Sequence, residues 1–361
     1  MPRAHLDYDS IIAHHLKVLE KLQAPSGLFR ASASSVTTGY DKAWLRDNFY
    51  ECLAFEYVGR WDIVRKTYRA ILDIFLKHEA QIDKAIKKKP TIAHAYIHPR
   101  YHPTTFEQFW EDWGNKQNDA VGAILFRIGE LEQHPEFSLI ENANDKRIVQ
   151  KLVNYLESLE YWMDTDNGMW EENEEVHASS VGACVAGLKK IQELGFIKVK
   201  PQLITRGEEV LRKMLPRESE QKFTDLALLS LIYPYNIVTA TERDEILRNM
   251  EYHLVKDMGV LRYKNDMYYN SDKVDGRSQE AEWTFGFSWL AIIYEQMGDQ
   301  EKAKHYLQRA MATVNKGGDI PELYFSHSHE HNENSPLGWS ESMFIVATHL
   351  FNEKYVKPFG K

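Results

Sequence analysis

The sequence predicts an all-α protein whose helices form a closed ring of six hairpins, the (α/α)6 barrel. Helical periodicity dominates the 361 residues, and strand-like runs are few and short. Tight turns, at Gly59-Arg60 and Gly298-Asp299, alternate with long loops rich in Trp, Tyr, Asp, Glu and Asn. Hairpins joined in this way curl into a double ring with the long loops at one rim. Because no Pro-, Gly- or Ser-rich linker interrupts the chain, we expect a single domain over residues 1–361.

The first helix shows the pattern on which the others are assigned. Over residues 9–23, apolar side chains such as Leu16 and Leu19 fall on one stripe, and Asp9 or Ser10 can cap the helix. The same reasoning predicts about twelve helices, over residues 9–23, 44–59, 61–79, 116–133, 145–163, 178–194, 201–215, 223–233, 241–255, 279–297, 300–315 and 338–352.

Two segments have the character of short strands, residues 261–263 and 323–325, and we expect them to form local pairs. Cys52 and Cys184 each lie in an apolar stretch, which predicts buried thiols rather than a disulfide. No segment approaches the ~18 apolar residues that a membrane span requires. The first residues lack the charged and then apolar pattern of a signal peptide. We therefore expect a cytoplasmic protein with no membrane partner.

The charge balance and the aromatic content indicate the class of ligand. The chain has 44 basic and 53 acidic residues, a net charge of −9, which argues against nucleic acid because phosphate binding needs clustered cations. Aromatic residues make up 12% of the chain, and tryptophans fall beside carboxylates. This combination suits sugars, since a pyranose ring has apolar faces that stack on aromatics and hydroxyls that bond to charged groups.

The first two long loops carry candidate binding residues. The loop before the second helix ends in a segment that contains Trp44, Arg46 and Asp47, and a later loop contains Trp113 and Asp119. The Arg-Asp pair could clamp substrate hydroxyls, or it could be a helix-start acid with an incidental cation. Similarly, Asp119 could be a helix cap, whereas the tryptophan could form a stacking wall.

The loop around Trp170 is the most informative. There Glu171 and Glu172 follow the indole directly, within a run of four glutamates in five residues. One interpretation is a solvated acidic surface. The other is a carboxyl that is partly desolvated and crowded by like charge, and both effects raise a pKa toward general-acid use. In a later loop, Glu322 could supply the second carboxyl that glycosidic cleavage requires.

The histidine spacing allows a metal site but does not favour one. His94 and His98 lie four residues apart, and His327, His329 and His331 alternate, so zinc ligation is conceivable. No H-E-x-x-H signature, Gly-rich phosphate loop, G-x-S-x-G elbow or Cys-based redox motif is present. We therefore expect neither a metal nor a cofactor.

Taken together, the loops resemble glycoside hydrolase family 15, the glucoamylase family, which also includes the barrel domains of phosphorylase kinase regulatory subunits. The resemblance covers roughly residues 26–350 and implies an (α/α)6 barrel, here without a β-sandwich before it. It rests on these ordered motifs: Trp44-Leu45-Arg46-Asp47, Trp113-Gly114 with Gln117-Asn118-Asp119, Gly168-Met169-Trp170-Glu171-Glu172, Leu261-Arg262-Tyr263, Glu282-Trp283, Pro321-Glu322-Leu323-Tyr324 and Pro336-Leu337-Gly338-Trp339-Ser340.

The resemblance implies a role for each matching residue. Glu171 matches the general acid, Glu322 the general base that activates water, and Glu172 a substrate-binding neighbour that holds up the pKa of the acid. The family inverts the anomeric centre, which requires the two carboxyls to lie ~6.5–9.5 Å apart. The other matches are expected to bind the terminal glucose: Trp44, Arg46, Asp47, Trp113, Asp119, Trp170, Arg262 and Trp339.

These observations predict an inverting, exo-acting α-glucosidase that removes glucose from the non-reducing end of short α-glucosides. Two alternatives stay open. One is a non-hydrolytic carbohydrate-binding or regulatory protein related to phosphorylase kinase subunits. The other is a different barrel hydrolase, trehalase-like or acting on unsaturated uronides; a uronate should need an extra cation cluster, for which Arg46 and Arg262 are the clear candidates. An oligosaccharide or small α-glucoside is the expected partner.

Overall fold

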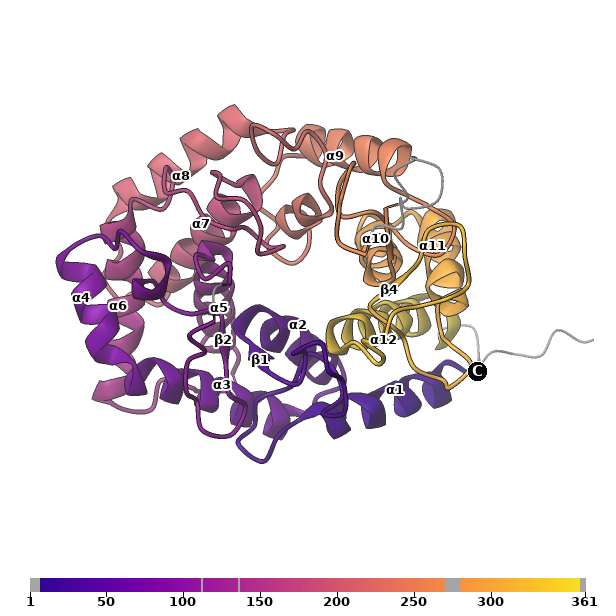
Figure 1. Ribbon diagram of the computed structural model, residues 1–361, viewed down its shortest axis with the longest axis horizontal. Coiled ribbons are helices and arrows are strands. Elements are labelled where there is room, and N and C mark those ends of the chain that lie inside the picture. Colours follow the sequence, from indigo (N-terminus) through magenta and orange to yellow (C-terminus); the bar gives the residue numbers. More distant parts are fainter. Residues whose placement is uncertain (1–6, 112, 136, 270–279, 358–361) are drawn as a thin grey trace, which may run out of the picture.

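The computed structural model describes residues 7–111, 113–135, 137–269 and 280–357, and its helices form two concentric rings (Figure 1). The predicted all-α (α/α)6 barrel is confirmed. In the described chain, the inner ring contains α2 (Leu45–Tyr57), α5 (Asn118–Leu131), α7 (Ala178–Glu193), the 3-10 helix η2 (Leu226–Leu231), α10 (Phe285–Gln296) and α12 (Gly338–Phe351). The outer ring contains α1 (Tyr8–Leu22), α3 (Trp61–Lys77), α6 (Ala143–Leu159), α8 (Pro201–Met214), α9 (Ala240–His253) and α11 (Gln300–Ala312).

The two rings differ in burial, as their sequences require. The inner helix α10 is apolar on all sides and is buried from Phe285 to Glu295. In contrast, the outer helix α8 buries one stripe, which includes Leu203 and Leu211, and exposes the rest to solvent. A helix that is apolar all round must be enclosed, whereas an amphipathic helix covers it. Periodicity therefore separates the inner helices from the outer ones.

Glycine allows two inner helices to approach closely. A Cβ atom at Gly122 of α5 would lie 2.5 Å from the backbone of Ala183 and Cys184 in α7. Gly187 of α7 packs in the same way against the carbonyl of Gly122. Any side chain at these positions would force the helices apart.

The ring closes where α12 packs against α1 and α2 (Figure 1). Ser32 forms an isolated β-bridge with Leu337, and the Ser342 hydroxyl donates to the Tyr50 carbonyl at 2.6 Å. The N-terminal and C-terminal hairpins are therefore neighbours. Both ends of the described chain contribute to one closed structure.

Two short pairs of antiparallel strands connect the loops at the rim. β1 (Ala43–Trp44) pairs with β2 (Arg100–Tyr101), and β3 (Glu282–Trp283) pairs with β4 (Leu323–Tyr324). The predicted strand at 323–325 is largely confirmed, but its partner is β3. The predicted strand at 261–263 is wrong, because this segment forms only an isolated bridge between Tyr263 and Asp225.

Other boundaries also differ from the prediction. The expected helix at 223–233 is the six-residue η2, flanked by turns. The helix expected from residue 279, which lies outside the described residues, begins at Phe285 because the two residues of β3 are extended instead. Three helical elements were not predicted: α4 (Glu79–Lys87), η1 (Ala93–Ala95) and a short π-helix, η3 (Asn352–Val356). Cys52 and Cys184 are buried free thiols, as predicted. Within the ranges described, no helix has both the length and the apolarity to cross a membrane.

Candidate functional site

A cavity lies where the inner helices α2 and α12 begin, at the rim that carries the two strand pairs. Several separate loops supply its walls, and most of the predicted site residues meet there. The lining residues are Ala31, Tyr40, Trp44, Arg46, Asp47, Met169, Trp170, Glu171, Arg262, Trp283, Glu322, Leu337 and Trp339.

The first turn of α2 places a buried cation at the cavity. Arg46 is 4% exposed, and its NH1 atom donates to Gln117 at 2.8 Å and to Asp119 at 3.1 Å. Burial opposes the charge of Arg46, but the carboxylates of Asp119, Glu171 and Asp47 raise its pKa, so the guanidinium stays charged. Asp119 lies behind Arg46 and does not line the cavity. Asp119 accepts a hydrogen bond from Arg46 and so holds the guanidinium group in position.

Asp47 lines the cavity beside Arg46. Burial raises its pKa to about 7, and the charges of Glu171 and Glu322 act in the same direction while Arg46 opposes them. Asp47 therefore lies close enough to Glu171 and Glu322, the two predicted catalytic residues, for their charges to affect its pKa. Three carboxylates and one guanidinium form a compact, desolvated polar cluster.

Four donors converge on the Glu171 carboxyl. The Trp44 indole donates at 2.7 Å, Gln117 at 2.9 Å, and Arg46 lies 3.4 Å away. The Trp113 indole donates to the other carboxyl oxygen. These groups come from two segments, residues 44–46 and 113–117, and orient the carboxyl.

The backbone at Glu171 is specialised. Its φ is +63°, a left-handed conformation that is uncommon for a residue with a side chain. Gly114 packs against this turn, where a Cβ atom would lie 2.7 Å from the Glu171 carbonyl. The Trp113-Gly114 loop therefore closes directly over the Glu171 turn.

The neighbouring Glu172 belongs to a different network. Its carboxyl accepts from Arg262 at 2.8 Å, Tyr263 at 2.5 Å and Lys222 at 3.0 Å. Burial alone would raise its pKa, but Arg262 and Lys222 outweigh burial and lower it. Glu172 is thus an anion next to Glu171, and it fixes the Arg262 guanidinium from one side while Asp266 binds it at 2.6 Å from the other.

Glu322 follows Pro321 at the start of β4 and is 1% exposed. Its Oε2 atom accepts from Asn332 at 2.5 Å and from Asn334 at 2.8 Å. Burial raises the pKa of Glu322, whereas the hydrogen bonds from both amides and from Tyr40, together with Arg262, act against this. The net rise brings the carboxyl closer to the working range of a general base.

Aromatic rings form the remaining wall. Trp339 stacks on Phe285 at 4.6 Å and on Tyr50 at 4.3 Å between ring centroids. Trp170 lies 5.8 Å from Trp283 and 6.3 Å from Trp339. The apolar faces of these indoles and the polar cluster share one cavity, which matches the two kinds of surface on a sugar ring.

A buried network supports the loop that carries Trp170. The indole donates to Asp225 at 2.8 Å, and the nearby His177 bonds to Asp166 at 2.8 Å. Burial opposes the charge of His177, but Asp166 raises its pKa to about 9. Burial raises the pKa of Glu218 to about 8. The Trp170 loop thus lies on a buried network of hydrogen-bonded side chains.

Some cavity residues were not among the predicted site residues. Tyr40 and Trp283 line the cavity, and Asn332 and Asn334 hold Glu322. Trp283 belongs to the Glu282-Trp283 motif and Tyr40 lies four residues before Trp44, which was the available signal. The asparagines lie in a polar loop with no distinctive spacing, so only the folded structure links them to Glu322.

The histidines do not assemble a metal centre in the described ranges. His98 bonds through Nε2 to the His94 carbonyl at 3.3 Å, and the two rings lie 5.9 Å apart. No group of three or more His, Cys, Asp or Glu side chains in the described part of the chain is placed to hold a metal ion.

The double ring of helices and the cavity at its loop rim define a six-hairpin barrel protein with a site of carboxylates, tryptophans and paired arginines. The chain belongs to glycosyl hydrolase family 15, whose sequence model matches residues 8–200.

Solved structures share the fold. A wild-type glycosidase has a TM-score of 0.79 at 17% identity, with 96% of this chain and 97% of that chain covered. A glycosidase variant in complex with glucose gives a TM-score of 0.79 at 18% identity, with 95% of this chain and 96% of that chain covered. The glucoamylase from Saccharomycopsis fibuligera gives 0.67 at 13% identity and covers 96% of this chain and 95% of its own.

Curated relatives include regulatory proteins. The liver isoform of phosphorylase b kinase regulatory subunit alpha from Mus musculus is 26% identical, over 85% of this chain and 30% of its own length. The probable subunit alpha from Drosophila melanogaster is 23% identical, over 94% of this chain and 32% of its own length. The chain thus spans about a third of these relatives.

Proposed function

We propose that this protein is an inverting, exo-acting α-glucosidase that releases glucose from the non-reducing end of short α-glucosides. The observation that carries the proposal is that Glu171 and Glu322 line one cavity together with Arg46 and Arg262. Two carboxyls are the groups that glycosidic cleavage requires. Membership of the glycosyl hydrolase family and the shared fold of glycosidases support the same class of reaction.

In this proposal Glu171 is the general acid. Its carboxyl is oriented by indole, amide and guanidinium donors, and it would give its proton to the oxygen of the leaving sugar. Glu172 beside it is an anion held by Arg262 and Lys222, and it does not share the donors that orient Glu171.

Glu322 is the general base. Two amides hold its Oε2 atom, and a carboxylate has further lone pairs that can take a proton from water. That water would attack the anomeric carbon on the face opposite to the leaving group, so that an α-linkage gives β-glucose. Inversion also requires the carboxyl separation of ~6.5–9.5 Å expected above.

The remaining groups would bind the terminal glucose. Arg46 and Arg262 are charged, buried and fixed by carboxylate partners, so they can donate to hydroxyls with little loss of side-chain entropy. Trp170 and Trp339 line the cavity with aromatic surface for the sugar ring. Asp47, whose pKa is about 7, can accept from a hydroxyl.

Product stereochemistry tests the proposal. The protein is mixed with maltose, isomaltose, trehalose or maltotriose, and the first anomer formed is followed by ¹H NMR. Initial β-glucose is expected. Initial α-glucose from maltose, isomaltose or maltotriose would contradict inversion, and cleavage of trehalose alone would favour the trehalase-like alternative.

Matched variants test the roles of the two carboxyls. Glu171→Gln and Glu322→Gln should each reduce kcat by about 10²–10⁴-fold, the size of a general acid or base contribution. Glu220→Gln is the control, because Glu220 is exposed and does not line the cavity. A kcat equal to that of the wild type in either of the first two variants would refute the assignment.

The regulatory relatives favour a second candidate, a carbohydrate-binding protein without turnover. Here the same cavity would bind sugar reversibly. Saturable binding of maltose to the wild-type protein without glucose release would support this alternative, and hydrolysis at an enzymatic rate would exclude it.

A further inference from the structure

A second cavity lies at the opposite end of the inner helices. Helix α2 contributes Arg46 to the candidate site and Tyr57 to this cavity, about 16 Å apart at 1.5 Å per residue. The ends of α5 and α10 and the segment after η2 complete the walls. Its volume is about 670 Å³, within the ~300–1,000 Å³ typical of small-molecule sites.

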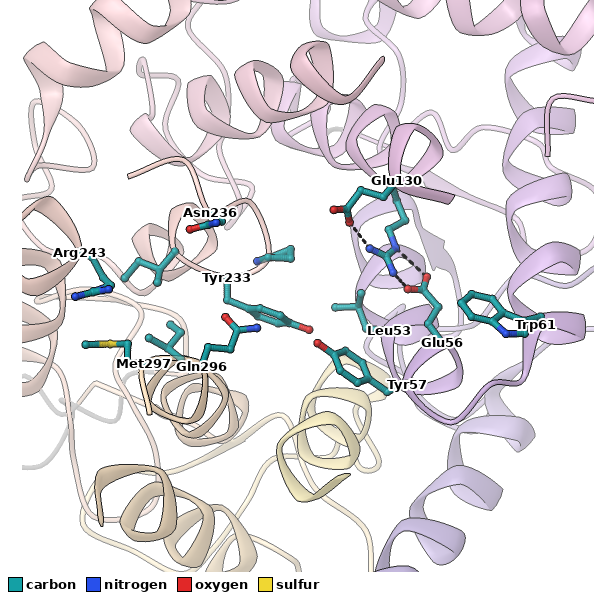
Figure 2. A pocket seen from close by; sticks show the side chains of 14 residues that line it. Leu53, Glu56, Tyr57, Trp61, Glu130, Tyr233, Asn236, Arg243, Gln296 and Met297 are labelled. Atoms are coloured by element: carbon teal, nitrogen blue, oxygen red, sulfur yellow. Dashed lines mark hydrogen bonds and ion pairs between the residues drawn. The ribbon is translucent and has the colours of Figure 1, made fainter. Parts of the chain in front are cut away.

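Figure 2 shows a charged group on one side of this cavity. Arg127 donates to Glu56 at 3.0 Å and is also paired with Glu130. Glu56 is only 7% exposed. Burying such a charged group is costly, and apolar residues of similar volume would serve packing as well. A polar cluster in this position therefore suits a polar ligand.

The centre of the cavity is aromatic and hydroxylated. The hydroxyls of Tyr57 and Tyr233 point toward each other, and Trp61 lies beside Glu56 (Figure 2). Burial raises the pKa of both tyrosines, so both hydroxyls keep their protons. Two facing hydroxyls can share one hydrogen bond, and each retains further donor or acceptor capacity.

The charges select the class of ligand. Arg127 is offset by two carboxylates, and Arg243 at the far side pairs with Asp244 at 2.7 Å. An anion would meet the two glutamates, and an organic cation would meet the two guanidinium groups. A neutral molecule rich in hydroxyls faces neither repulsion and can use carboxylates, guanidinium groups and amides together.

We propose that this cavity is a second binding site, distinct from the candidate catalytic site, for a neutral polyhydroxylated ligand such as a monosaccharide. Tyr57 and Trp61 supply aromatic surface, and the Glu56–Arg127 pair supplies oriented acceptors and donors. Gln296, on the exposed end of α10, contributes an amide at the opening. The proposal does not depend on hydrolysis at the other site.

The experiment is a glucose titration of the full chain labelled with 5-fluorotryptophan and followed by ¹⁹F NMR. The Trp61 signal reports on this cavity and the Trp339 signal on the candidate catalytic site, each assigned with its Trp→Phe variant. We expect glucose to shift the Trp61 signal saturably. Gln296→Phe, which places a ring in the opening, should abolish that shift, whereas the exposed Gln300→Phe outside the cavity should not.

A second variant and two competing probes complete the test. Tyr57→Phe should weaken glucose binding at Trp61 by about three- to tenfold, the loss of one neutral hydrogen bond. An unchanged Trp61 signal with glucose, or a stronger response to choline or inorganic phosphate, would overturn the inference. A shift at Trp61 without one at Trp339 would support the second site while contradicting the proposed function. The reverse pattern would leave only the proposed function standing.

Discussion

Replacing Asn334 with alanine should raise the pKa of Glu322. The Asn334 amide donates to the carboxyl at 2.8 Å and favours its charged form, against the effect of burial. A hydrogen bond to a charged group contributes about 1.5–3 kcal/mol, and one pKa unit corresponds to about 1.36 kcal/mol. Losing this bond should therefore raise the pKa by about 1–2 units. Asn332 still donates at 2.5 Å, so the carboxyl keeps its position.

The assay is kcat/KM for maltose as a function of pH. A general base must be deprotonated in the free enzyme, so the ascending limb follows its pKa and should move to higher pH by the same amount. Asn173→Ala is the matched control, because Asn173 is an exposed asparagine in the loop of Glu171. A uniform loss of activity without a displaced limb, or a limb moved to lower pH, would refute the reasoning.

Three further perturbations test other parts of the molecule. Arg46→Lys should lower kcat/KM at least tenfold in steady-state assays, because an ammonium group cannot reproduce the fork that donates to three side chains; Arg248→Lys, on the exposed face of α9, is its control. The pKa of His177 is about 9, above its ordinary 6.5, so the stability it contributes is complete below pH 6.5 and is lost as pH rises through 9. Thermal melts of the wild type should therefore fall over that window, and those of His177→Gln should fall less. Gly122→Ala should lower the free energy of unfolding by at least about 1–3 kcal/mol in urea titrations, because its Cβ would lie 2.5 Å from the α7 backbone.

Each of these expectations has a contradicting result. Equal activity of Arg46→Lys and its control would show that substrate binding does not require the Arg46 guanidinium. A wild-type melting temperature that rises between pH 6.5 and 9, or a His177→Gln profile parallel to it, would show that the histidine pair is not coupled to folding. If Gly122→Ala has the same free energy of unfolding as the wild type, the inner helices can move apart without destabilising the fold.

The ring of helices was predictable because inner and outer helices have different periodicity. The stripe on α1 and the all-apolar α10 appear in the sequence before any tertiary contact is known. In contrast, η2 has the composition of a helix, but Pro234 and the neighbouring turns limit it to six residues. The strand pairs are two residues long, too short for a pattern of alternation.

The candidate site was predictable as a set of loops but not as a set of contacts. Glu171 and Glu172 are adjacent in sequence, yet one faces indoles and the other is held by Arg262 and Lys222. The left-handed turn at Glu171 directs the two side chains into different surroundings. Likewise, the hydrogen bonds of Asp119 direct it to Arg46, which composition could not reveal.

Ring closure has a consequence for how the protein folds. The contact of Ser32 with Leu337 joins residues about 300 positions apart, and Ser342 bonds to Tyr50 across a similar separation. Contacts between residues so far apart in sequence form late, because the chain loses the entropy of closing the loop before these contacts stabilise it. Helix content should therefore recover early after dilution from urea. Glu171 and Glu322 come together in one cavity only after the ring closes. Catalytic activity should therefore be the last property that the refolding protein regains.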